Sequence, residues 1–131
     1  MHVETYTIGG DGDVIWLNET NREVQLLWAH FNYSSSATVG SRRMSMILIA
    51  PDTSEVTMCH AGVVQAASQS AVHYRFVPGT FRETALIDNA VEVPFPMQFF
   101  IPKDYTLKFG DKTAIDIAGD TSILNFQIKR T

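Results

Sequence analysis

The chain has little of what several functional classes require. It contains one cysteine, Cys59, among 131 residues, so no internal disulfide can form and the fold does not depend on an oxidising compartment. No window approaches the ~20 consecutive apolar residues that a membrane span needs. The N-terminus, MHVETYTIGG, lacks the basic start and apolar run of a secretory signal. We therefore expect a chain that is soluble as made, has no membrane partner and is held by packing alone.

Basic residues are also scarce. Ten Lys and Arg stand against 14 Asp and Glu, which gives a formal net charge of −4. Phosphate contacts need a surface rich in Lys and Arg, so a nucleic-acid partner is not expected. Heptads, long repeats and low-complexity tracts are missing, which argues against coiled coils and solenoids. With 45% apolar residues, residues 1–131 can bury the core of a single domain.

Motifs for catalysis and metal binding are missing too. Ser34–Ser36 lie outside any GxSxG elbow, and Gly9–Asp13 lacks the lysine of a phosphate-binding loop. The sequence has no HxH followed by glutamate, as metal-binding cupins have, and none of its histidines pairs at same-face spacing with another ligand. These histidines are His2, His30, His60 and His73. We expect no enzymatic activity and no cofactor.

What the sequence does contain is a period of two. In the last third of the chain, 91–130, Tyr105, Leu107 and Phe109 alternate with polar residues. After a loop rich in Gly and Asp, Leu124, Phe126 and Ile128 do the same. Such alternation puts the apolar set on one face of a strand and is typical of an antiparallel sheet with one buried face. We expect the final strand, 123–129, to be central.

Similar short segments occur along the whole chain, with turn signals between them. Pro51–Ser54, Pro78-Gly79 and Asp88-Asn89 are such turns, and three prolines around 97–101 predict a short or edge strand there. The expected strands include 14–17, 42–50, 56–61 and 71–77. Residues 1–13 are either an N-terminal arm or an edge strand followed by a loop. The pattern predicts an all-β fold with little or no helix, an antiparallel β-sandwich or jelly roll in one domain.

One segment, Glu23–Tyr33, fits two structures. Thr20 and Glu23 have the spacing of a helix capping box. The apolar residues fall at helical spacing, namely Val24, Leu27, Trp28 and Phe31. We favour a strand, because aromatic and β-branched residues suit a pleated surface and the rest of the chain predicts strands. Both faces of that strand would be partly apolar, which calls for a second cover such as a partner subunit.

Two clusters are candidate sites. Asp111, Asp116 and Asp120 would supply the hard oxygen atoms that Ca²⁺ prefers, but their spacing matches no EF-hand. Turn formation explains the same residues, and we favour it over a metal site. Arg42 and Arg43 form the one tight basic pair inside the chain. We favour a solvated strand start, with contact to an acidic partner surface as the alternative.

Two stretches carry a family resemblance. SSSATVGSRRMSMILIAPD combines a polar turn, Arg, an apolar strand and a Pro/Asp turn. The tail IPKDYTLKFGDKTAIDIAGDTSILNFQIKR combines proline, an aromatic, Leu and Asp, then Gly-Asp before a final strand. Together they resemble small structural proteins of tailed bacteriophages, in particular jelly-roll decoration or cement proteins of the capsid.

The resemblance implies a homotrimer seated at threefold or quasi-threefold axes of the shell, where it clamps neighbouring subunits of the major capsid protein. The protein would be made in the host cytoplasm and located on the capsid surface of the virion. The alternative is a carbohydrate- or receptor-binding β-sandwich with exposed aromatic side chains. The candidates for that role are Trp16, Trp28, Tyr33 and Tyr74, although alternation places Tyr74 with the core.

Overall fold

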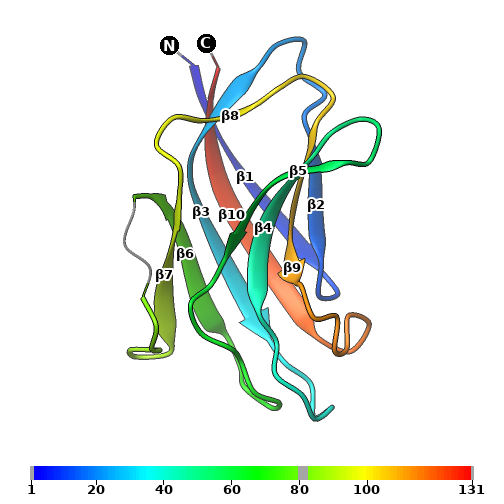
Figure 1. The fold of residues 1–131 in the computed structure, drawn as a ribbon, viewed down its shortest axis with the longest axis vertical. Coiled ribbons are helices and arrows are strands. Elements are labelled where there is room, and N and C mark those ends of the chain that lie inside the picture. The colour runs from blue at the N-terminus through cyan, green and yellow to red at the C-terminus, as the bar shows by residue number, and fades with distance from the viewer. Residues whose placement is uncertain (1, 80–82, 131) are drawn as a thin grey trace.

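The computed structural model of the chain describes residues 2–79 and 83–130. These residues form two packed β-sheets (Figure 1) and contain no helix, hence none that could cross a membrane. The strands are β1 (His2–Gly10), β2 (Val14–Leu17), β3 (Val24–Ser34), β4 (Met44–Ile49), β5 (Glu55–His60), β6 (Val72–Pro78), β7 (Ala90–Phe95), β8 (Phe99–Ile101), β9 (Thr106–Asp111) and β10 (Thr121–Arg130).

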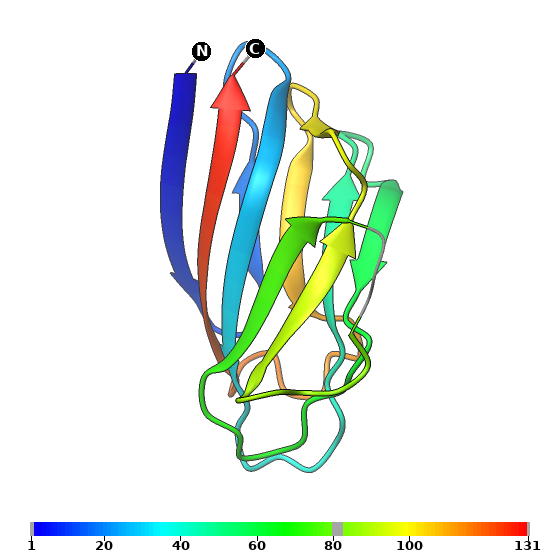
Figure 2. The same ribbon diagram turned by 90° about the vertical axis from the view of Figure 1, so that its left-hand side faces the viewer.

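The two sheets have the strand order of a rolled-up hairpin. The larger sheet runs β1-β10-β3-β6-β7, with β8 beside β3, and the smaller runs β2-β9-β4-β5. Figure 2 shows the larger sheet in front of the smaller. The antiparallel pairs are nested along the chain, β1 with β10, β2 with β9, β3 with β6 and β4 with β5, which is the pairing of a jelly roll. The predicted all-β sandwich is confirmed, and within the described strands β6 and β7 form a parallel pair.

The core lies between the sheets. In β10 the alternate residues Leu124, Phe126 and Ile128 are fully buried, as the sequence period predicts. The ring of Phe109, on the smaller sheet, contacts two rings of the larger sheet. Its centroid lies 5.8 Å from that of Phe31 and 5.2 Å from that of Phe76. These aromatic contacts join the sheets without any covalent link.

Strand β3 confirms the strand interpretation of 23–33 but corrects its alternation. Trp28 is opposite Gln127 and Leu26 is opposite Ile128, so Leu27 is an extra residue in β3. This β-bulge shifts the side chains that follow it to the other face. The buried residues of β3 are therefore Val24, Leu26, Ala29, Phe31 and Tyr33. The predicted division of residues between the two faces was wrong for this strand, because the bulge puts Leu26, Phe31 and Tyr33 on the same buried face, while Trp28 stays on the outer one.

The ends of the chain lie side by side. Strand β1 pairs with β10 along its whole length, from His2 opposite Arg130 to Gly10 opposite Ser122. The edge-strand interpretation of residues 1–13 is thus confirmed over 2–10, and the free-arm interpretation is wrong there. Because β10 lies between β1 and β3, the prediction of a central final strand is also confirmed.

Substitution of the β10 core should destabilise the whole sandwich. We expect Phe126→Ala to lower the free energy of unfolding by about 3–5 kcal/mol, since it leaves a cavity under both sheets. The control is Ile123→Ala on the opposite face of β10, where the side chain is 49% exposed, with an expected change of about 0.5 kcal/mol or less. Urea unfolding measures both. Equal losses would contradict the assignment of the two faces.

Candidate functional site

Arg42 is the centre of a buried polar network at one end of the sandwich. Its Nε donates to Asp120 Oδ2 at 2.9 Å and its Nη2 donates to Asp120 Oδ1 at 3.2 Å. Nη1 and Nη2 also donate to the carbonyls of Gly40 and Thr38, at 2.9 and 3.0 Å. Both side chains of the ion pair are 0% exposed. The solvated strand start and the partner contact are both wrong for Arg42, because its guanidinium is enclosed by its own chain.

Asp120 accepts hydrogen bonds from two further residues. Besides Arg42, the Tyr33 hydroxyl donates to Oδ2 at 2.6 Å and the Ser36 amide donates to Oδ1 at 2.8 Å. Burial by itself raises the pKa of the Asp120 carboxyl, but the hydrogen bonds from Arg42, Ser36 and Tyr33 outweigh it and lower the pKa overall. Burial and the bond to Asp120 raise the pKa of Tyr33. The carboxylate is therefore charged and the phenol neutral at physiological pH.

The network extends to a third segment through Gln65. The backbones of Arg42 and Gln65 bond to each other in both directions, at 2.8 and 2.7 Å. Gln65 Nε2 donates to the Tyr33 carbonyl at 3.0 Å, and the Tyr74 hydroxyl donates to Gln65 Oε1 at 2.9 Å. The segments 35–43 and 61–69 and the start of β10 are thus tied together. These hydrogen bonds hold the loops in place, and the polar groups that form them are bonded to one another.

Arg43 differs from its neighbour. Its side chain is half-buried, and Nη1 donates to the Ala61 carbonyl at 2.7 Å. Its backbone amide donates to Asp111 Oδ1 at 3.0 Å. Arg42 therefore forms the buried ion pair, whereas Arg43 binds the loop before β6.

The three candidate aspartates are all bonded to protein donors, Asp111 in the turn after β9 and both Asp116 and Asp120 at Ser36. Asp111 accepts from the Thr113 and Ile115 amides at 2.9 and 3.0 Å, which closes the turn after β9. Asp116 accepts from the hydroxyls of Ser36 and Thr38 at 2.5 and 2.8 Å. Within residues 2–79 and 83–130, no group of three or more His, Cys, Asp or Glu could hold a metal ion. The geometry of these three residues is that of turns and loop contacts.

Gly119 makes the second of these turns feasible. A Cβ at this position would lie 2.3 Å from Asp116 Oδ2, whereas the Gly119 amide donates to Asp116 Oδ1 at 3.1 Å. A side chain there would push the carboxylate away from Ser36. The Asp116–Gly119 turn therefore needs glycine for space.

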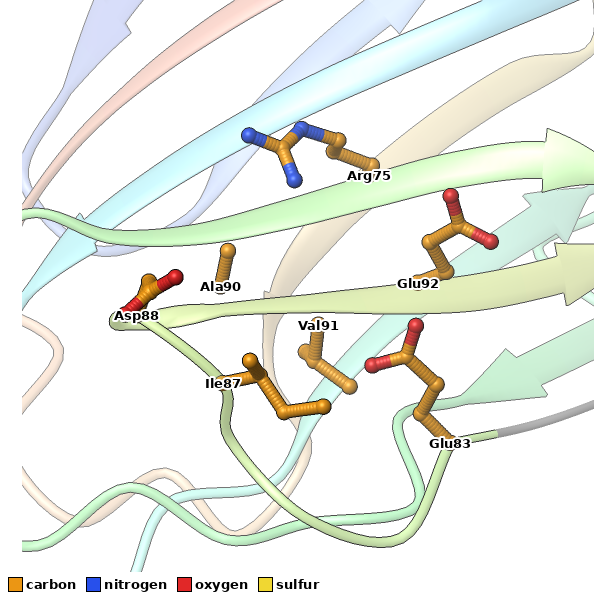
Figure 3. Close-up of a pocket in the computed structure, with 7 residues that line it drawn as sticks. All are labelled: Arg75, Glu83, Ile87, Asp88, Ala90, Val91 and Glu92. Atoms are coloured by element: carbon orange, nitrogen blue, oxygen red, sulfur yellow. The ribbon is translucent and has the colours of Figure 1, made fainter.

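A hollow of about 310 Å³ lies beside β6 and β7, and Figure 3 shows the side chains that line it. Among the described residues that line it, the charged side chains are one guanidinium and three carboxylates, and none of these residues carries a hydroxyl, thiol or imidazole that could act as a nucleophile with a base. The lining residues are Arg75, Glu83, Ile87, Asp88, Ala90, Val91 and Glu92. Nearby, His30 Nε2 and His73 Nδ1 are 3.0 Å apart on the outer face of the larger sheet. Burial, then the neighbouring His73 and Arg75, lower the pKa of His30, which favours its neutral form.

The outer faces of the two sheets differ in chemistry. The larger sheet carries hydrogen-bonded polar side chains, such as Thr7 with Asn125 at 2.6 Å and Trp28 with Gln127 at 3.2 Å. The smaller sheet instead carries two cross-strand rows of mostly apolar residues. They are Ile15, Lys108, Ile47 and Met58 in one row and Leu17, Thr106, Ile49 and Glu55 in the other. We call these two rows the aliphatic face.

Two apolar members of the aliphatic face are open to solvent, whereas Ile47 is buried. Ile15 is 58% exposed and Leu17 is 43% exposed, and Val56 on the neighbouring β5 is 54% exposed. Alternation missed this face, although the apolar run Met46–Ile49 in β4 is a signal for a strand covered on both sides.

The fold and this face define the protein as a jelly-roll β-sandwich with one apolar outer surface. A scan against protein-family models found no match, and a search of curated proteins found no similar sequence.

Loss of the buried ion pair should be costly and dependent on pH. We expect Arg42→Met to lower the free energy of unfolding by about 3–5 kcal/mol at pH 7, because it leaves Asp120 buried without its cation. The pKa of Asp120 is lowered in the folded protein, so its contribution is present above the ordinary value of 3.8 and is lost as the pH falls through the lower folded pKa. The difference between wild type and variant in urea unfolding should therefore shrink below about pH 4. A constant difference from pH 7 to pH 2 would contradict the role given to Asp120.

Removal of divalent cations should not affect the fold. Because Asp111, Asp116 and Asp120 are engaged by protein donors, we expect the same melting temperature with EDTA and with millimolar Ca²⁺. Differential scanning calorimetry measures it. A large drop in EDTA that Ca²⁺ reverses would favour the metal site instead.

Proposed function

We propose that the chain is a structural virion protein, a decoration or cement protein that binds the outside of a phage head and stabilises neighbouring subunits of the major capsid protein. The observation that carries this proposal is the aliphatic face, a sheet surface apolar enough to need a cover. The resemblance of 34–52 and 101–130 to phage decoration proteins supports the same role. In this proposal the protein acts mechanically and catalyses no reaction.

The aliphatic face suits contact between copies of the chain in a homotrimer. Its two charged members are both paired, Lys108 with Asp13 at 3.3 Å and Glu55 with Lys112 at 3.4 Å. The methylene stem of Lys108 can lie over the neighbouring aliphatic side chains. Permanent interfaces between copies are richer in apolar residues than transient ones. A trimer would present three equivalent attachment surfaces to the shell, so that modest contacts add up through avidity.

The buried network suits a protein that must keep its shape on a shell. The Arg42–Asp120 pair and its partners fix three segments without a disulfide or a metal ion. A rigid end loses little conformational entropy when it docks. The proposed location is the capsid surface of the virion, reached after synthesis in the host cytoplasm.

A carbohydrate-binding β-sandwich would carry a stripe of exposed aromatic side chains. Tyr33 and Tyr74 are fully buried, as alternation predicted for Tyr74. Trp28 lies on the outer face of the larger sheet and Trp16 packs against the core, so the two indoles point to different sides of that sheet. The four candidates therefore do not form one stripe, and the observations favour the structural role.

The proposal is tested by oligomeric state and by binding to heads. We expect multi-angle light scattering to give the mass of a trimer, and we expect the trimer to cosediment with expanded, DNA-filled heads of the phage that encodes it. Ile15→Glu should dissociate the trimer, because it places a charge in the aliphatic face. The matched control is Ile123→Glu, at a similarly exposed isoleucine on the larger sheet. A monomeric wild type that does not cosediment with heads would overturn the proposal.

A further inference from the structure

A second hollow of about 310 Å³ lies at the corner where β1 and β2 meet. Its floor is aromatic. Tyr6 of β1 and Trp16 of β2 have ring centroids 5.6 Å apart, and both rings pack on Phe126, at 5.1 and 5.2 Å. The lining residues are Tyr6, Trp16, Leu17, Glu19, Thr20 and Arg130, and we call this hollow the corner pocket. It is separate from the buried network and from the hollow of Figure 3.

Arg130 supplies a cation with unused donors. Its Nη2 donates to Glu4 Oε1 at 2.7 Å, while its Nε is shielded from solvent and has no hydrogen-bond partner within the described part of the chain. The planar fork of arginine matches a carboxylate better than any other common group.

The other side of the corner pocket carries acceptors. Glu19 is an exposed carboxylate, and the Thr20 hydroxyl already donates to Asn18 Oδ1 at 2.6 Å, so its lone pairs remain for a ligand. Tyr6 is held in place because its hydroxyl donates to Glu4. A ligand that fits must therefore combine a carboxylate, hydroxyl donors and a flat apolar face.

We propose that the corner pocket binds an acidic saccharide, that is, a sugar ring bearing a carboxylate. The carboxylate pairs with Arg130, ring hydroxyls donate to Glu19 and Thr20, and the C–H face of the ring lies against Trp16. The volume of about 310 Å³ is at the small end of ligand pockets and accommodates a single sugar ring. This binding goes beyond the cement role and does not depend on it.

The test is a titration of the full-length protein with methyl glucuronide, followed by the NMR signals of the two tryptophan indoles. Methyl glucoside, which replaces the carboxylate by a hydroxymethyl group, is the neutral probe. We expect a saturable shift of the Trp16 signal with the glucuronide and at least about tenfold weaker binding of the glucoside. The Trp28 signal, on the outer face of the larger sheet, should not move. Trp28→Phe assigns the two signals and should leave binding unchanged.

Variants separate the roles of the charges. Arg130→Gln should weaken glucuronide binding about tenfold or more and make the two probes equal, whereas Arg75→Gln, on an exposed arginine of β6, should change nothing. Glu19→Ala, in the exposed loop after β2, should weaken the binding of both probes without changing the unfolding midpoint. This variant tests the pocket even if Arg130→Gln does not fold. Equal binding of the two probes by the wild type, or no saturable Trp16 shift with either, would overturn the proposal. The result is independent of oligomeric state.

Discussion

The ion pair between Arg42 and Asp120 is the constraint on which one end of this sandwich depends. Two fully buried charges are stable only when each has its partner and the remaining donors and acceptors are satisfied. Carbonyls of the 35–43 segment, the Ser36 amide and the Tyr33 hydroxyl meet that requirement. Because all of these groups must be in position together, the pair sets the relative placement of β3, the loop before β4 and the start of β10.

The outer faces of the two sheets differ in their chemistry. The outer surface of the larger sheet is mixed, with hydrogen-bonded polar side chains beside Trp28 and the exposed Ile123. The bulge at Leu27 keeps Phe31 and Tyr33 on the inner side. The smaller sheet keeps aliphatic residues on both sides. A jelly roll normally needs one buried face per sheet, so the second apolar face is surplus to folding and available for association. The edge where β1 meets β2 adds a third kind of surface, aromatic and charged at once.

The local pattern of apolar and polar residues predicted the strands. The polar network and the faces of β3 depend on pairing between residues far apart in the sequence, which that pattern does not contain. The alternation in 105–109 and 124–128 is a property of neighbouring residues, so the strands and the buried face of β10 followed from sequence. The bulge in β3 depends on its register with β10, which no local period specifies. Arg42 and Asp120 are 78 positions apart, so a basic pair after a serine-rich loop indicated solvent and gave no sign of the buried partner. The turn role favoured for Asp111 rests on residues close in sequence, and its bonds to the Thr113 and Ile115 amides are of that kind.

The pairing of β1 with β10 has a topological consequence. His2 and Arg130 are direct neighbours across an antiparallel ladder (Figure 1), where paired Cα atoms lie about 4.5–5.5 Å apart. A linker of a few residues therefore suffices to join the two ends, and the exposed turn at Asp52–Ser54 between β4 and β5 offers a place to open the chain. Such a circular permutant keeps every strand pair of the sandwich while moving the ends to the smaller sheet. In the natural arrangement, any cargo fused to either end is displayed from the same pole of the molecule.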